Sequence, residues 1–172
     1  EAVGDDVKQF SEGDQIYGDI SDMGFGTFAE YVAIDAQCLV KKSPNLSYEE
    51  ATAISHAGCL ALQGLKDLGK INEGDKILIN GGGGGVGSIA LQIAKMYNAE
   101  VTGVDAGNKL TYMSNMGFDQ VFDYQKIDFT KSGVKYDLIL DCHTTRSGFK
   151  FYKSLKQTNL FVSVTQKHFY FN

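Results

Sequence analysis

A run of five glycines, residues 81–85, constrains the fold of this chain more than any other feature. The run follows a short apolar segment, Lys76–Asn80, and precedes a helical pattern that starts at Val86 and continues with Ile89 and Ile93. Strand, glycine turn and helix in this order are typical of a parallel α/β unit rather than of a flexible linker.

The glycine run also satisfies a G-x-G-x-x-G pattern through Gly82, Gly84 and Gly87. Taken alone this pattern is weak evidence, because most glycine-rich runs are flexible loops. Here Asp105 stands 18 residues beyond Gly87, at the end of the next predicted strand, as in dinucleotide-binding units. A pyrophosphate must approach backbone that carries no Cβ, and the N–H groups of a helix start supply its donors. Because no Lys-Ser or Lys-Thr follows the glycines, an ATP-binding P-loop is disfavoured.

Strand and helix patterns alternate through the rest of the chain, which predicts an α/β fold. Further strands are expected at Glu100–Val104, Gln120–Asp123, Tyr136–Cys142 and Asn159–Val164, and helices at Asn108–Met116 and Arg146–Lys156. The continuous apolar run Leu138–Leu140 indicates a strand covered on both faces. Repeats of this kind form parallel sheets with right-handed crossovers, so we expect a Rossmann-type doubly wound parallel sheet.

The first 46 residues show a different pattern, of short β segments separated by Gly-Asp turns. These segments are expected at Gln15–Tyr17, Thr27–Ile34 and Cys38–Lys41. A helix follows, from the capping box of Ser47 and Glu50 to Leu68. We therefore expect a small β region at residues 1–46 and a second domain at residues 47–172.

Charge and composition exclude several classes of partner. The net charge is −5 and no basic run is present, so no nucleic-acid partner is expected. No apolar stretch approaches the roughly 20 residues of a membrane span, and the first residues are acidic rather than basic and apolar. We expect a cytoplasmic protein without membrane association. The chain opens at Glu1 without a methionine, which suggests that upstream residues are missing.

The three cysteines do not form a pattern that binds metal or makes disulfides. Cys38, Cys59 and Cys142 are odd in number and far apart in the sequence. We expect reduced, mostly buried thiols and no metal site.

The second strand of the predicted sheet carries evidence on the choice of nucleotide, and that evidence points two ways. Asp105 is placed to accept hydrogen bonds from the ribose of NADH and to repel the 2′-phosphate of NADPH. Lys109, one helical turn later, and Tyr124, after the third strand, are placed to contact that phosphate instead. The alternative is that Lys109 is a solvated helix charge and Tyr124 a packing residue.

Five segments taken together carry a family resemblance. They are Ile16-Tyr17-Gly18, GTFAEYV at 26–32, AGCLALQGL at 57–65, INEGDKILINGGGGGVGSIALQIAK at 71–95 and YDLILD at 136–141. They resemble the medium-chain dehydrogenases/reductases, and specifically the zinc-independent, zeta-crystallin-like quinone oxidoreductase branch. In that family a GroES-like β domain precedes a Rossmann domain. The resemblance therefore implies a partial GroES-like domain at residues 1–46, and a Rossmann domain whose last strand lies beyond Asn172.

The resemblance also implies roles for individual residues. The pyrophosphate loop matches Gly82, Gly84, Gly85, Val86 and Gly87, while Lys109 and Tyr124 match positions that often favour NADPH. His143 stands where the family usually has a small residue beside the adenosine and its ribose, so it is expected to crowd the cofactor. Leu60 replaces a threonine that many members place near the nicotinamide.

Zinc is not expected, because the four-cysteine lobe of the zinc alcohol dehydrogenases is absent between Tyr17 and Gly26. His56 lies near the position of a zinc ligand in that branch, but a lone histidine is more often a hydrogen-bonded residue.

The function implied by the resemblance is hydride transfer from NADPH, with NADH possible, to a quinone or an α,β-unsaturated carbonyl compound. The full-length protein is expected to be a homodimer, and no catalytic residue is assigned. Two alternatives stay open at this point. One is a zinc-dependent alcohol dehydrogenase, and the other is a crystallin-like protein that binds nucleotide without turnover.

Overall fold

The chain forms two compact units, Glu1–His56 and Ala57–Asn172. The computed structural model describes residues 1–24, 26–144, 148–164 and 170–171. Helix α1, Tyr48–Leu62, begins in the first unit and ends in the second. None of the helices in the described residues is long and apolar enough to span a membrane.

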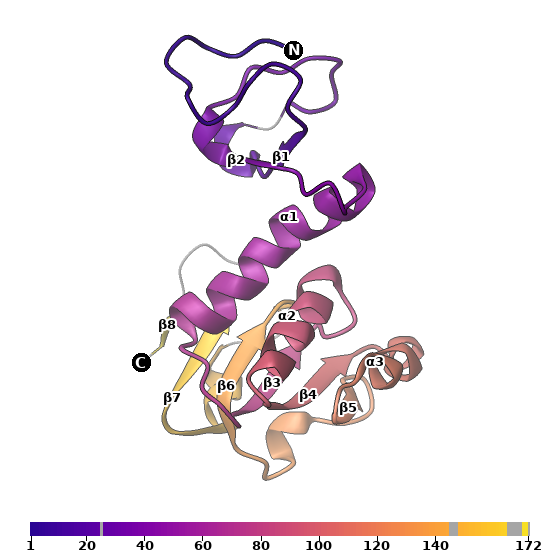
Figure 1. Cartoon of the computed structure of the whole chain (residues 1–172). Coiled ribbons are helices and arrows are strands. Elements are labelled where there is room, and N and C mark those ends of the chain that lie inside the picture. The colour runs from indigo at the N-terminus through magenta and orange to yellow at the C-terminus, as the bar shows by residue number, and fades with distance from the viewer. Residues whose placement is uncertain (25, 145–147, 165–169, 172) are drawn as a thin grey trace. The chain divides into compact units, whose positions relative to one another are not determined.

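The second unit is built on a six-stranded sheet (Figure 1). Its strands are β3 (Lys76–Asn80), β4 (Glu100–Asp105), β5 (Gln120–Asp123), β6 (Tyr136–Asp141), β7 (Leu155–Ser163) and β8 (Tyr170–Phe171). They lie in the order β5-β4-β3-β6-β7-β8, and every pair is parallel except β7 with β8. The first five strands confirm the parallel sheet predicted from the alternating pattern.

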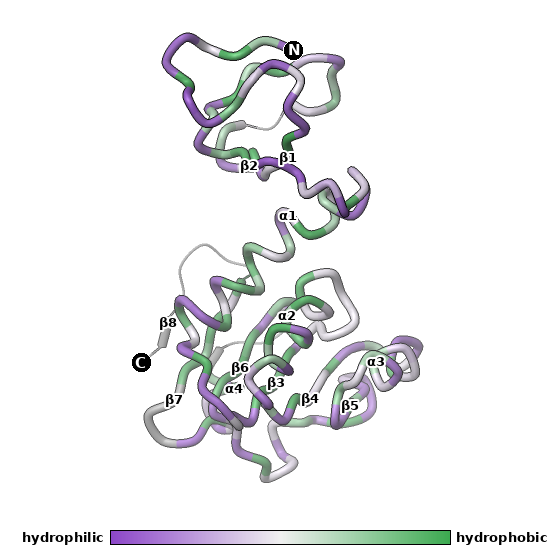
Figure 2. Tube along the Cα trace, viewed as in Figure 1, coloured by the Kyte–Doolittle hydropathy of each residue, from purple (hydrophilic) through white to green (hydrophobic). Residues whose placement is uncertain are grey.

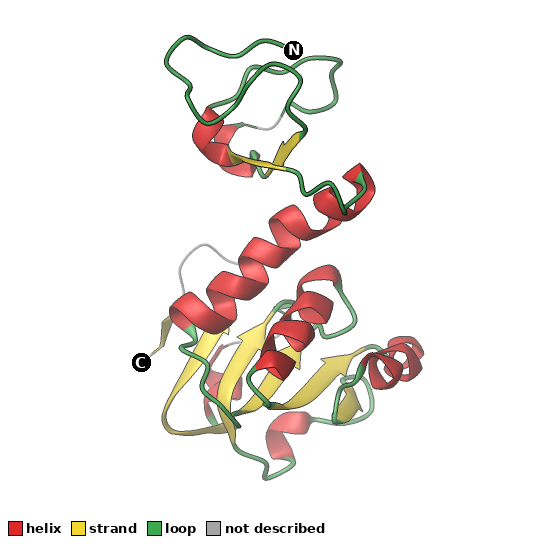
Figure 3. Ribbon diagram, in the orientation of Figure 1, coloured by secondary structure: helices red, strands yellow, loops and turns green. Residues whose placement is uncertain are grey.

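Successive residues of the central strands point to opposite faces, and each face has its own apolar cluster. Ile77 and Ile79 of β3 belong to one cluster, whereas Leu78 between them belongs to the other. Figure 2 shows the hydrophobic character of these strands, and Figure 3 shows the helices that accompany the sheet. A sheet that is buried on both faces is the doubly wound arrangement expected from the sequence.

The two faces of the sheet are covered by different helices. The cluster with Ile77 and Ile79 receives side chains from α2 (Gly85–Met96), α3 (Leu110–Met116) and the π-helix Gln63–Leu68. The cluster with Leu78 receives Phe151 from α4 (Gly148–Tyr152) and Phe129 from the 3-10 turn Phe129–Lys131. Phe151 stacks on Phe161 of β7 with ring centroids 5.0 Å apart.

The predicted capping box at the start of α1 is present. The Ser47 N–H donates to Glu50 Oε2 at 2.8 Å, and the Glu50 N–H donates to Ser47 Oγ at 3.1 Å. The helix continues to Leu68 as predicted, but its last part, Gln63–Leu68, is a π-helix. Close packing accompanies this change, because a Cβ on Gly64 would lie 2.5 Å from Leu140 Cδ1 of β6.

The first unit contains little regular structure. Strand β1, Ile16–Gly18, pairs antiparallel with β2, Leu39–Lys41, close to two of the predicted segments. The prediction of a strand at Thr27–Ile34 is wrong. The sheet of this unit consists of β1 and β2, so that segment has no ladder partner in the described part of the chain.

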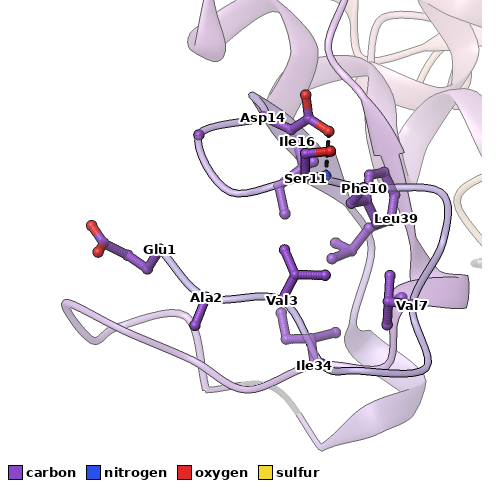
Figure 4. A pocket seen from close by; sticks show the side chains of 13 residues that line it. Glu1, Ala2, Val3, Val7, Phe10, Ser11, Asp14, Ile16, Ile34 and Leu39 are labelled. Carbon is purple, nitrogen blue, oxygen red and sulfur yellow. Dashed lines mark hydrogen bonds between the residues drawn. The ribbon is translucent and has the colours of Figure 1, made fainter.

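A small hollow of about 120 Å³ lies in the first unit. The side chains of Val3, Val7, Phe10, Ile34 and Leu39 line it, as Figure 4 shows. These five apolar side chains therefore surround an open space.

The predicted helix Arg146–Lys156 is too long. Helix α4 covers Gly148–Tyr152, and Arg146 lies outside the described residues. Strand β7 begins at Leu155, four residues before the predicted start, because Leu155 pairs with Tyr136 before a register irregularity in β6 and β7. A pairing beyond a register irregularity leaves no periodic signal in the sequence.

Candidate dinucleotide-binding site

The strand order of the second unit reverses beside β3. The chain proceeds from β3 to β4 and β5 on one side, and then to β6 and β7 on the other. In open α/β sheets, ligands bind outside the carboxyl ends of the strands at such a reversal. The carboxyl ends of β3 and β6 are Asn80 and Asp141, which face each other in register.

Buried polar side chains mark this edge of the sheet. Four strands end in residues that are at most 8% exposed: Asn80, Asp105, Asp123 and Asp141. Buried polar groups are found where they are hydrogen-bonded, and their partners here are loops that follow the strands.

The glycine loop turns sharply at the end of β3. Gly81 has a φ of +88°, a conformation that favours glycine. The N–H groups of Gly81 and Gly82 both donate to Val104 O of the neighbouring strand, at 2.8 and 3.1 Å. The Gly84 N–H donates back to Gly81 O at 3.1 Å. These bonds tie the loop to the sheet and to itself.

The glycines of the loop differ in how much space surrounds them. A Cβ on Gly82 would lie 2.7 Å from Met113 Cε, and a Cβ on Gly87 would lie 2.4 Å from Gly81 O. A Cβ on Gly84 would meet only Gly81 O, at 3.4 Å. Gly82 and Gly87 therefore allow the loop to pack on the protein, whereas Gly84 faces open space.

Helix α2 begins beside this open space. Its N-cap is Gly84, which has no side chain to cap the helix, and the Ser88 N–H makes the first helical bond to Gly84 O at 2.9 Å. The N–H groups of residues 85–87 precede that bond and are the donors that a helix start leaves without a helical partner. Such a start favours an anion through its N–H groups and its dipole. We call the glycine loop, residues 81–85, together with the start of α2 the glycine cradle, and the N–H groups of its helix start favour an anion.

Asp105 and Lys109 lie next to the glycine loop. The Asp105 Oδ2 accepts the Gly83 N–H at 2.9 Å, and Oδ1 accepts the Ala106 N–H at 2.8 Å. The Lys109 ammonium lies 3.1 Å from Oδ1 and 3.2 Å from Oδ2. Lys109 is therefore an ion-pair partner of Asp105, and its side chain is still 43% exposed.

Tyr124 reaches the same edge through its backbone. Its N–H donates to Asp105 O at 3.2 Å, and its side chain packs against the apolar cluster that contains Leu78. The Tyr124 hydroxyl lies 3.5 Å from Gln125 Nε2. The structure thus brings Asp105 and Lys109 together beside the glycine loop, whereas the Tyr124 side chain is a packing residue of the Leu78 cluster.

His143 lies on the other side of that loop. Its carbonyl accepts Asn80 Nδ2 at 3.0 Å, and its N–H donates to Asp141 Oδ1 at 3.3 Å. Asn80 Nδ2 also donates to Asp141 Oδ1 at 2.8 Å, so the two buried residues hold the His143 backbone from both ends. A Cβ on Gly81 would lie 3.0 Å from the His143 Cβ. The exposed imidazole therefore starts at the edge of the cradle.

Comparisons with known proteins find similar sequences and a similar fold. A family model described as zinc-binding dehydrogenase matches residues 85–161. The chain is 36% identical over 171 residues to a 2-methylene-furan-3-one reductase of Solanum lycopersicum, which is 95% of this chain and 43% of that protein. The quinone oxidoreductase structure from Coxiella burnetii has a TM-score of 0.85 at 30% identity, covering 94% of this chain and 51% of that one. Together these matches support a medium-chain dehydrogenase/reductase of the quinone oxidoreductase-like kind, over part of its length.

Other relatives in this superfamily carry related names. An NADPH-dependent alkenal/one oxidoreductase of Arabidopsis thaliana is 33% identical over 147 residues, which is 81% of this chain and 38% of that protein. The chain spans about half the length of the curated relatives that it matches. Its fold is a Rossmann-type sheet preceded by part of a GroES-like β domain, as the sequence predicts.

Among the described residues, no group of three or more histidine, cysteine or acidic side chains is placed to hold a metal ion. His56 Nδ1 is 2.5 Å from Asp19 Oδ2, and this hydrogen bond lowers the pKa of Asp19. Burial raises the pKa of the Cys142 thiol to about 12, so at neutral pH it is an unreactive thiol beside the loop. Leu60 is half-buried in α1.

Several residues of the cradle do not follow from the sequence motif. Gly81 and Gly83 fall outside the spacing of G-x-G-x-x-G, yet one makes the left-handed turn and the other binds Asp105. The motif also does not include Asn80 and Asp141, which hold the backbone of His143 beside the glycine loop. A polar residue that closes a continuous apolar run is the signal that identifies them, because a buried strand rarely ends in a polar side chain without a partner.

Proposed function

We propose that the protein is an NAD(P)H-dependent oxidoreductase that reduces a quinone or the activated double bond of an α,β-unsaturated carbonyl compound. The observation that carries this proposal is the glycine cradle at the reversal of the strand order, which is closed by packing at Gly82 and Gly87 and open at Gly84. We assign dinucleotide binding to residues 47–172 and propose that residues 1–46 belong to the substrate domain.

The names of the relatives support the substrate class. They include a furanone reductase, a chloroplast envelope quinone oxidoreductase homolog and an alkenal/one oxidoreductase. These substrates share an electron-poor carbon that accepts a hydride. Neither a zinc alcohol dehydrogenase nor a crystallin-like role is favoured by these names.

The described residues contribute binding and orientation. When bound, the nicotinamide supplies a hydride at its C4 position. In this proposal the N–H groups at the start of α2 bind the pyrophosphate, and the His143 backbone, held by Asn80 and Asp141, lies next to the glycine loop. A fixed cofactor brings the hydride and its acceptor into one geometry, which lowers the entropic part of the barrier. No catalytic residue is assigned among the described residues.

Gly84→Val tests the cradle. The φ of −99° and ψ of 176° at Gly84 suit valine, so the fold should persist, but the branched side chain would occupy the space proposed for the pyrophosphate. We expect dinucleotide affinity to fall at least about 100-fold, corresponding to about 2.7 kcal/mol, by calorimetry on the purified protein. Gly4→Val is the matched control, because its Cβ would come no nearer than 3.9 Å to Val7 Cγ2. Unchanged affinity in Gly84→Val would contradict the site.

We propose NADPH as the preferred nucleotide, with NADH as the alternative. Lys109 ends the 3-10 turn Gly107–Lys109 that follows β4, and its side chain is 43% exposed. A charge-assisted contact to the 2′-phosphate is worth about 1.5–3 kcal/mol. Lys109→Ala should therefore weaken NADPH binding about 10- to 150-fold and NADH binding much less. Lys95→Ala is the control, since Lys95 makes a similar ion pair with Asp119. Equal losses for the two nucleotides would contradict the proposed contact between Lys109 and the 2′-phosphate, and tighter binding of NADH by the unaltered protein would contradict the preference for NADPH.

We also propose that the reaction does not use zinc. Two features support this. The segment between Tyr17 and Gly26 has no cysteine, and His56 already binds Asp19. Metal analysis of the purified full-length protein tests the proposal, and stoichiometric zinc would return the alcohol dehydrogenase function to consideration.

Compartment and oligomeric state stay predictions. The sequence led us to expect a cytoplasmic homodimer, whereas relatives include proteins named chloroplastic and mitochondrial. Imaging of the tagged full-length protein tests the compartment, and light scattering of the purified protein tests the dimer.

A further inference from the structure

Asp105 has an unusual position for a residue expected to read the ribose. Its side chain is only 10% exposed, although it ends a strand at the edge that faces the proposed cofactor. Both carboxylate oxygens have donors. Oδ2 accepts the Gly83 N–H, Oδ1 accepts the Ala106 N–H, and the Lys109 ammonium lies within 3.2 Å of each. The carboxylate is therefore part of the loop structure.

Gly83 is shaped for this contact. A Cβ at this position would lie 2.7 Å from Lys109 Cδ and 3.1 Å from Asp105 Oδ2. The lysine stem and the carboxylate therefore pack directly on the Gly83 backbone, which only glycine permits without movement of these groups. Gly83 lies between Gly82, which is closely packed, and Gly84, which faces open space. The contact with Asp105 therefore fixes the backbone position of the loop at Gly83.

We propose that Asp105 is a positioning residue that holds the glycine loop through Gly83, and that it does not select NADH by reading its ribose. Turning the carboxylate to a ribose hydroxyl would break charge-assisted bonds to two backbone N–H groups, and such bonds are about twice as strong as neutral ones. Lys109 also neutralises much of the charge that would repel a 2′-phosphate. This inference rests on the proposed function, because it assigns the loop to a dinucleotide.

The two roles give opposite results in Asp105→Asn. An amide can accept on one side only, so its NH₂ group must face a donor at Gly83 or at Ala106 and Lys109. If Asp105 positions the loop, affinity for NADPH and for NADH should fall by similar factors, about 10-fold, and their ratio should change less than about 2-fold. If Asp105 reads the ribose, NADH should lose affinity selectively and NADPH should bind as well or better. That selective result would overturn the proposal.

Hydrogen exchange supplies a readout that needs no nucleotide. In Asp105→Asn the Gly83 amide should exchange about 10-fold faster, because its charged acceptor is gone. Gly83→Ala should displace the same groups and produce the same loss of affinity. The double variant should then be little worse than either single variant, since both remove one interaction. An unchanged exchange rate at Gly83, or fully additive losses, would overturn the proposal.

Asp119, which precedes β5 and contacts the start of β4, provides the matched control. Its Oδ2 accepts the Val101 N–H at 2.6 Å and the Lys95 ammonium at 2.5 Å, which copies the chemistry of Asp105 away from the loop. Asp119→Asn should keep both nucleotide affinities and the exchange rate of Gly83. If the unaltered protein bound neither nucleotide, the proposed function would fail, and the exchange rate of Gly83 would still support or overturn the contact itself.

Discussion

The two units of the chain bury very different amounts of apolar surface. In the described part of the first unit the buried hydrophobic residues are Ile20 and Ala51, while Phe28 and Tyr31 are exposed. The second unit has two apolar clusters, one on each face of its sheet. Hydrophobic burial is the main favourable term in folding, so the second unit carries most of the stability of this chain. In this chain, short β segments alone therefore do not form a hydrophobic core.

The units also differ in charge. The first has 11 acidic and 3 basic residues, whereas the second has 10 acidic and 13 basic residues. The net positive charge of the second unit, which also has the glycine cradle, favours binding of the anionic dinucleotide that we propose. The acidic first unit does not favour an anionic ligand.

The largest expected effect comes from the core of the second unit. Ile79→Ala removes a fully buried side chain from β3 and leaves a cavity, so we expect a loss of about 2–5 kcal/mol in the free energy of unfolding. Val40→Ala is the counterpart in the first unit, where the side chain is 52% exposed, and should cost less than about 0.5 kcal/mol. Urea unfolding of the full chain measures both. Equal losses would remove the contrast between the units.

The tightest glycine of the cradle should give the next effect. Gly87→Ala places a Cβ 2.4 Å from Gly81 O, and backbone on both sides must move, so we expect a loss of about 1–3 kcal/mol. Gly85→Ala is the control, because its Cβ would lie 3.7 Å from Ala57 Cβ. Thermal unfolding separates the two variants, and a stable Gly87→Ala would mean that the helix start is not closely packed.

A smaller effect is expected where the first unit enters helix α1. Ser47→Ala removes the side-chain acceptor for the Glu50 N–H and should destabilise the first turn by about 1 kcal/mol. Hydrogen exchange of the Glu50 amide measures this locally, and amides of α2 should keep their exchange rates. Loss of protection in both helices would indicate that the units unfold together.

The smallest expected effect depends on pH. Burial disfavours the ionised Asp119, but the bonds from Lys95 and Val101 outweigh it and lower the pKa of this carboxyl group. A lowered pKa in the folded state stabilises the protein above about pH 4, and this stabilisation is lost as the pH falls through the folded pKa. Because the side chain is 42% exposed, Asp119→Asn should cost less than about 1 kcal/mol at pH 7 and less again at pH 2. Urea unfolding at both values tests this.

Local pattern was sufficient for most of the second unit. The strand Lys76–Asn80, the glycine turn and the helix after it lie where the sequence predicts them, because periodicity and capping act over a few residues. The wrong strand at Thr27–Ile34 shows the limit of that approach. A β segment needs a partner strand for its hydrogen bonds, and no local pattern specifies whether one is present.

The sequence by itself determined the class of fold and the place of the glycine loop between a strand and a helix, since both follow from short-range order along the chain. Only the tertiary structure decided what the residues at this loop contact. The Gly83 N–H and Asp105 are 22 residues apart, and Asn80 and Asp141 are 61 apart. Contacts over such separations exist only after the strands assemble, because pairing and register bring their ends to one edge of the sheet.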